Sequence, residues 1–205
     1  MNMDFKFELT RLLELIDAHL RKATPNVAQT LQLNTARLNS KLIKDSRLEN
    51  QNFWAAKATI GSARKQLASA PENIRLMASY ISVIAHELDW YKKPNTVDDP
   101  EFHKNHFNAI IFGERGLATC EDLMLGVTVM HPHTMYPKHR HRPEELYIAL
   151  SESEWWQPNQ NWFAPGVGGT VHNPSNSLHS MRSAGTPLLA LWLMYGDPYF
   201  VPGSA

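Results

Sequence analysis

Apolar residues in positions 1–90 recur at steps of three and four, which is the period of an amphipathic helix. One predicted helix presents Phe5, Leu9, Leu12, Ile16 and Leu20 on a single face. Two further segments show the same spacing, first through Phe53, Trp54, Ile60, Ala63 and Leu67, and then through Met77, Ile81, Ile84 and Leu88. The run Ser69-Ala70-Pro71-Glu72 predicts the start of the last helix, with the serine as its cap. Residues 27–43 have a weaker helical pattern.

The pattern changes after Pro94. Short apolar runs are then separated by proline, glycine and asparagine, which is typical of strands in an antiparallel sandwich or barrel. The predicted strands lie in residues 106–113, 123–130, 145–156 and 188–195. No low-complexity linker divides the two parts. We therefore expect a helical region, residues 1–94, packed against a β domain of residues 95–205.

The charge of the chain is balanced, with 20 basic and 20 acidic residues. No whole-protein field would therefore gather nucleic acid or an anionic membrane. Acidic residues interrupt the apolar positions of the N-terminal stretch, which argues against a signal peptide and a membrane span. The single cysteine, Cys120, excludes an internal disulfide and suits a reducing compartment. We expect a soluble, cytoplasmic protein, and nothing in the sequence specifies an oligomeric state.

Candidate metal ligands gather in YPKHRHRPEELY, residues 136–147. His139 and His141 are two apart, so in a strand they face the same way. A tight turn at residues 142–144 would place Glu145 and Tyr147 on the neighbouring strand, facing the same point. A further histidine, His179, follows a polar turn and enters a predicted strand. The pattern H-x-H-x3-E-x-Y with a downstream histidine thus predicts a metal site.

The donor set suits zinc, iron(II), manganese, cobalt or nickel, and the absence of cysteine ligands argues against a structural zinc site. The alternative is a solvated basic loop or an anion site, since Lys138, Arg140 and Arg142 alternate with the two histidines. The positions of Glu145 and His179 favour the metal. A second pair, His131 and His133, has the same spacing but no glutamate four residues on.

The order of these motifs resembles that of the cupin superfamily. The combination YPKHRH, EELY and LHS, after an N-terminal helical extension, most resembles the cupin-type dimethylsulfoniopropionate (DMSP) lyases of marine bacteria. The resemblance implies a mainly β fold, a cupin double-stranded β-helix barrel with an α-helical N-terminal extension. It also implies one divalent metal ion held by His141, Glu145, Tyr147 and His179. His139 would either ligate the metal or line the site.

The resemblance further implies a lyase that eliminates dimethyl sulfide and acrylate from DMSP, a small-molecule substrate. Tyr147 would act as the base, as a phenolate. Tyr136 is the second candidate for the base, or a substrate-binding residue that orients the reaction. Aromatic faces attract soft cations, so Trp192 is a candidate for the sulfonium site. Residues 162–169 (WFAPGVGG) have the glycine content of a mobile lid.

Two other functions fit the same motifs. One is a cupin dioxygenase or isomerase that uses iron or manganese. The other is a non-enzymatic effector-binding cupin whose helical part serves as an interaction module. Against the second stands the absence of a recognisable helix-turn-helix with a basic recognition face.

Overall fold

The computed structural model describes residues 5–31, 33, 51–93, 99–113, 115–118 and 122–196. The helices are α1 (Phe5–Ala23), α2 (Pro25–Leu31), α3 (Gln51–Lys65), α4 (Glu72–Ile84), the 3-10 helix η2 (Ala85–Glu87) and α5 (Pro100–Asn105). The boundary expected at residue 94 and Cys120 both lie outside the described residues, as does most of the predicted 27–43 helix. No helix in the described ranges is long and apolar enough to cross a membrane.

The three predicted amphipathic helices are present as α1, α3 and α4. Their apolar stripes are buried, from Leu9 to Leu20 on α1 and from Met77 to Ile84 on α4. Trp54 is an exception, because its side chain is 54% exposed. The predicted cap of α4 is also wrong. Pro71 occupies the cap position without a side-chain hydrogen bond, and Ser69 belongs to the preceding turn.

The strands form two antiparallel sheets. A five-stranded sheet has the order β1-β2-β8-β4-β6, and a three-stranded sheet has the order β3-β7-β5. Their bounds are β1 His106–Phe112, β2 Leu123–Met130, β3 Met135–His139, β4 Glu144–Ala149, β5 Glu154–Trp156, β6 Thr170–Asn173, β7 His179–Arg182 and β8 Leu188–Tyr195. The four predicted strand regions are confirmed, except that 145–156 divides into β4 and β5, which lie in different sheets.

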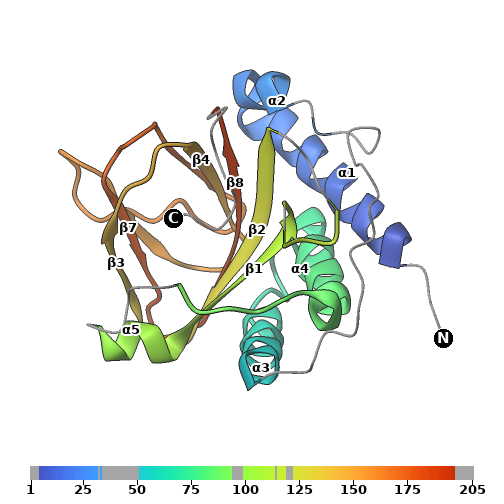
Figure 1. Cartoon of the computed structure of the whole chain (residues 1–205), viewed down its shortest axis with the longest axis horizontal. Helices are drawn as coiled ribbons and strands as arrows, with labels where there is room; N and C mark the ends of the chain where they lie inside the picture. The colour runs from blue at the N-terminus through green and yellow to red at the C-terminus, as the bar shows by residue number, and fades with distance from the viewer. Residues whose placement is uncertain are drawn as a thin grey trace.

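The five-stranded sheet separates two hydrophobic cores. Figure 1 shows the helices α1, α3 and α4 on one side of β1 and β2, with the remaining strands on the other. Alternate residues of the sheet, such as Leu125 and Val127 on β2, join the helices in one core. The opposite set, including Met124, Tyr147 and Trp192, forms a second core inside the barrel. Burial on both faces explains why the strands of this sheet are almost continuously apolar.

Candidate metal centre

Three histidines converge at one end of the three-stranded sheet. His139 is the last residue of β3 and His179 the first of β7, and the two are register partners. His141 lies just beyond β3, in the connection to β4. Each histidine offers one ring nitrogen, and these atoms all lie within 4.8 Å of one another.

Glu145 reaches this point from the other sheet. The predicted hairpin is wrong, because β3 pairs with β7, whereas β4 pairs with β6 and β8. Burial explains the difference. β4 is almost wholly buried and suits a sheet covered on both faces, whereas most of β3 is partly or fully exposed. Residues 140–143 therefore carry the chain from one sheet to the other, and the site lies where the two sheets face each other.

The orientation of the imidazoles is fixed by the backbone. In all three, Nδ1 lies 2.9–3.0 Å from a carbonyl oxygen two residues away in sequence. The carbonyls belong to Pro137 for His139, Pro143 for His141 and Ser177 for His179. A carbonyl accepts only, so Nδ1 carries the proton and Nε2 presents a lone pair. This is the arrangement of metal-binding histidines, whose second nitrogen donates to a carbonyl or carboxylate.

The Nε2 atoms of His141 and His179 both lie 3.1 Å from the same oxygen, Oε2 of Glu145. The carboxylate is completely buried, and Asn173 Nδ2 lies 3.4 Å from Oε2. Within the part of the chain that the structure describes, Glu145 Oε1 has no hydrogen-bond partner, and Nε2 of His179 has no polar neighbour to bond except this carboxylate. Such buried polar atoms are rare, and converging lone pairs need a positive charge between them. The residues present therefore fit a divalent cation.

The electrostatics of the cluster agree with this. Burial alone would lower the pKa of His141, but the hydrogen bond to Glu145 and the charge of Glu145 raise it above its ordinary value. Burial alone would raise the pKa of Glu145, yet the bonds from His141 and His179 hold it well below its usual range. Both directions show that this carboxylate stabilises a positive charge beside it.

His139 differs from the other two histidines. Burial, and then the charge of Lys93, lower the pKa of His139 to about 3. The ring is therefore neutral near pH 7, as a metal ligand must be. The sequence left open whether His139 ligates or lines the site, and its position within the cluster favours ligation.

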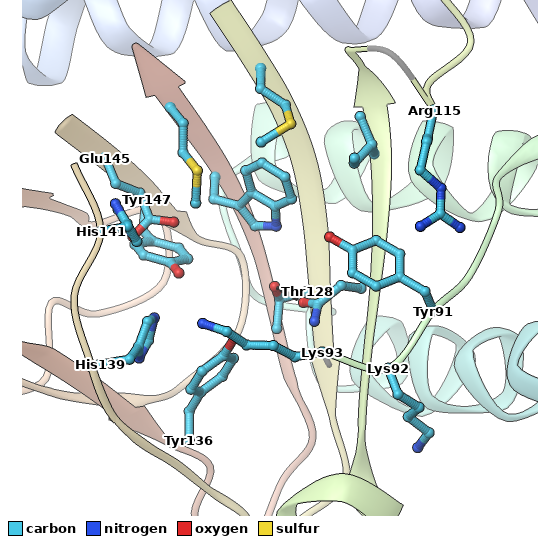
Figure 2. Close-up of a pocket in the computed structure, with 15 residues that line it drawn as sticks. Tyr91, Lys92, Lys93, Arg115, Thr128, Tyr136, His139, His141, Glu145 and Tyr147 are labelled. Carbon is cyan, nitrogen blue, oxygen red and sulfur yellow. Dashed lines mark hydrogen bonds and ion pairs between the residues drawn. The ribbon is translucent and has the colours of Figure 1, made fainter. Parts of the chain in front are cut away.

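Two buried tyrosines face the cluster. Tyr147 is two residues after Glu145 on β4 and is 3% exposed, with its ring 4.6 Å from that of Trp155. Tyr136 on β3 is 6% exposed and stacks on His139 with ring centroids 4.4 Å apart. Burial, and then the charge of Glu145, raise the pKa of both phenols well above the ordinary value. Figure 2 shows both rings directed into the same cavity.

The cavity has a volume of about 240 Å³ and contains most of the predicted site residues. Tyr136, His139, His141, Glu145, Tyr147 and Trp192 line it together. His179 is 3.1 Å from Glu145 at its inner end. The second histidine pair with the same spacing, His131 and His133, lines no part of the cavity. The predicted lid also lines no part of it. His19 bonds to the Gly168 carbonyl at 2.8 Å and fixes that loop against α1.

The floor of the cavity is the inner face of the five-stranded sheet. Ile110, Gly126, Trp192 and Tyr147 are successive register partners across β1, β2, β8 and β4. A Cβ atom on Gly126 would lie 2.0 Å from Cζ2 of Trp192. The glycine therefore provides the space in which the indole lies across β2.

Sequence reasoning missed the wall of the cavity opposite the histidines. This wall contains Tyr91, Lys93, Asn108 and Arg115. Residues 91–93 follow the helical region and precede Pro94, and no periodicity or motif marks them. A pair of lysines beside a tyrosine is the only signal there, and it is typical of many surface turns.

The two facing sheets and the buried histidine–glutamate cluster define a cupin barrel with an N-terminal helical extension, in which three histidines can hold a metal ion. Residues 32–190 match the model of the dimethylsulfoniopropionate lyase family. The match covers well over half of the chain, and the protein belongs to this family, whose members are carbon–sulfur lyases.

Solved structures agree on the fold. The DMSP lyase DddQ from Ruegeria pomeroyi DSS-3 superposes with a TM-score of 0.76 at 20% identity, over 97% of this chain and 95% of that chain. A structure from a study of the DMSP lyases RdDddP and RnDddQII gives a TM-score of 0.74 at 20% identity, over 96% of both chains. A search of curated protein sequences gave no significant match.

Proposed function

We propose that the protein is a metal-dependent DMSP lyase that converts DMSP to dimethyl sulfide and acrylate by β-elimination. The observation that carries the proposal is the buried cluster of His139, His141, His179 and Glu145, which opens onto a cavity lined by two tyrosines. Membership of the DMSP lyase family supports it independently.

The four residues of the cluster would hold the metal, with Tyr147 as a further candidate ligand. When bound, the divalent metal would act as a Lewis acid toward the substrate carboxylate and make the α-carbon more acidic. Glu145 has no solvent-exposed surface, and burial of a charged group strengthens the electrostatic interactions it makes.

The elimination needs one base. The base removes the α-proton, the electrons of that C–H bond form the C=C bond of acrylate, and the C–S bond breaks. Dimethyl sulfide departs with the bonding electrons as a neutral molecule, so no acid is required. Tyr147 is the proposed base because it lies on the same face of β4 as Glu145. Burial and the charge of Glu145 raise its pKa, and a divalent cation held beside it would oppose both effects and favour the phenolate. Tyr136, stacked on His139, is the alternative base or orients the substrate.

The sulfonium needs an apolar, aromatic surface. Trp192 lies between Gly126 and Tyr147 in the floor of the cavity, 4% exposed. An aromatic face contributes about 0.5–2 kcal/mol to binding a soft cation, depending on its desolvation. Trp192 is therefore the proposed sulfonium contact.

The test is headspace detection of dimethyl sulfide from the purified protein with DMSP, with and without a chelator, in air and under nitrogen. We expect sulfide in both atmospheres, loss of sulfide after chelation, and recovery when zinc, iron, manganese or nickel is restored. A requirement for oxygen would indicate a dioxygenase. No sulfide with any of the four metals would refute the proposal.

A further inference from the structure

A lysine enters the cavity from the side opposite the histidines. Lys93 follows Tyr91, whose backbone N–H and C=O both bond to Asn108 of β1 at 2.9 Å. The chain here runs along the free edge of the five-stranded sheet. Figure 2 shows the side chain of Lys93 reaching across the cavity toward Tyr136 and His139, whereas Lys92 points away from them.

The backbone of Lys93 is held by a buried histidine. Its N–H donates to Nε2 of His106 at 2.8 Å, and Nδ1 of His106 donates to the carbonyl of Phe102 at 2.7 Å. His106 is fully buried and stacks on the Phe102 ring with centroids 3.8 Å apart. The start of the lysine side chain is therefore fixed by the fold.

The ammonium group lies close to the metal cluster. Lys93 Nζ is 5.3 Å from the centroid of the Tyr136 ring. The charge of Lys93 contributes to the lowered pKa of His139 and opposes the raised pKa of His141. Burial lowers the pKa of Lys93, and the charge of Glu145 opposes that change. Lys93 and the cluster thus share one small, weakly solvated space.

The remaining floor of the cavity has a different character. Met124 and Met194 are register partners, and Trp192 lies two residues before Met194 on the same face of β8. With Ile110 these side chains form an apolar and aromatic patch. A cation pressed against the ammonium of Lys93 would be repelled, whereas a soft cation is stabilised on this patch.

We propose that Lys93 binds the substrate carboxylate, so that the site selects a small zwitterion with a carboxylate at one end and a soft cation at the other. The inference rests on the proposed lyase function and adds to it the residue that sets the direction of binding. The ammonium donates to one carboxylate oxygen and leaves the other directed at the histidine cluster. The cationic end then lies over Trp192.

The test compares the binding of propionate and propionamide, which differ in charge but hardly in shape, to the zinc-loaded protein. Binding is measured by ligand-observed NMR titration. The variants are Lys93→Met, which keeps the length of the side chain without its charge, and Lys93→Arg, which keeps the charge. Lys92→Met is the matched control, because Lys92 Nζ bonds to the Lys104 carbonyl at 2.6 Å and lies 3.6 Å from the centroid of the Phe107 ring. Zinc content is measured for each protein.

A charge-assisted hydrogen bond in such a site corresponds to roughly tenfold or more in affinity. We expect Lys93→Met to reduce the preference for propionate over propionamide by about tenfold, with propionamide affinity and zinc content unchanged. Lys93→Arg and Lys92→Met should keep the preference. A purely structural role would weaken both ligands equally. The assignment is overturned if the preference for propionate falls by less than about threefold in Lys93→Met. It is also overturned if the preference falls as strongly in Lys92→Met as in Lys93→Met. Because these ligands need no turnover, this outcome is distinct from a failure to release dimethyl sulfide.

Discussion

Gly126→Ala tests whether the sheet beneath the cavity is as tightly packed as the structure shows. The new methyl carbon would lie 2.0 Å from Cζ2, 2.4 Å from Cε2 and 2.5 Å from Cη2 of Trp192. All three atoms belong to one rigid ring, so no single bond rotation at the end of a flexible chain removes the overlap. β2 is paired along its length with β1 and β8, which restrains a backbone shift. The indole must therefore move into the cavity.

Overpacking of this kind costs about 1–3 kcal/mol of unfolding free energy. For a chain of this size each kcal/mol lowers the melting temperature by about 2–4 °C. We therefore expect Gly126→Ala to melt roughly 2–12 °C below the wild type. The displaced ring should also reduce the space for substrate, so KM for DMSP should rise even where the protein remains folded.

Gly61→Ala provides the matched control. Gly61 lies within α3, and a Cβ there meets no atom within 4 Å. Alanine in the interior of a helix is more stable than glycine by roughly 0.5–1 kcal/mol. The same substitution should thus raise the melting temperature at residue 61 and lower it at residue 126, as measured by differential scanning calorimetry. A Gly126→Ala protein as stable as the wild type, with unchanged KM, would refute this account of Trp192.

Three further results are expected. Tyr147→Phe should remove nearly all dimethyl sulfide release while the fold is kept, as monitored by circular dichroism; if most of the rate remains, Tyr136→Phe should instead abolish it. His179→Ala and Glu145→Gln should each lose bound metal together with activity, and stoichiometric metal in either variant would remove that residue from the ligands. Burial is the main cause that lowers the pKa of His106 to about 4. As the pH falls below about 6.5, the unfolded chain therefore binds a proton at His106 before the folded protein does, and the free energy of unfolding decreases until about pH 4. The chelated wild type should lose about 3 kcal/mol more over this range than His106→Gln in urea titrations, and parallel pH profiles would contradict the assignment.

Periodicity was sufficient to predict the three long helices α1, α3 and α4 and the long strands. The apolar stripes of α1 and α4 are read directly from three- and four-residue steps, and these stripes form most of the helical core. β1, β2 and β8 are recognisable as continuous apolar runs, because both of their faces are buried. Short strands such as β6 have no such signal, since four residues are too few to establish a period, and β7 was indicated only by the polar turn before His179.

Which side chains gather at the site was more predictable than how the strands bring them together. The spacing of His139, His141 and Glu145 indicates a shared site whatever the strand pairing. Whether His141 and Glu145 lie on one hairpin or on two sheets depends on which strands pair, and pairing is decided by burial over the whole barrel rather than by the turn at Pro143. Lys93 could not be found from sequence for a related reason. Its place in the cavity depends on the contact of Tyr91 with β1 and on the bond to His106.

The backbone carbonyls that orient the three imidazoles belong to residues 137, 143 and 177, each two positions from its histidine. Each imidazole is thus oriented by a carbonyl of its own short peptide, whereas most of the floor and the far wall of the cavity comes from β1, β2, β8, Arg115 and residues 91–93. The two sets of residues can vary independently. Side chains in the floor and the far wall can therefore be substituted to admit another molecule while the three histidines keep their orientation. The site is in this sense modular, because the histidine cluster and most of the cavity lining come from different parts of the chain.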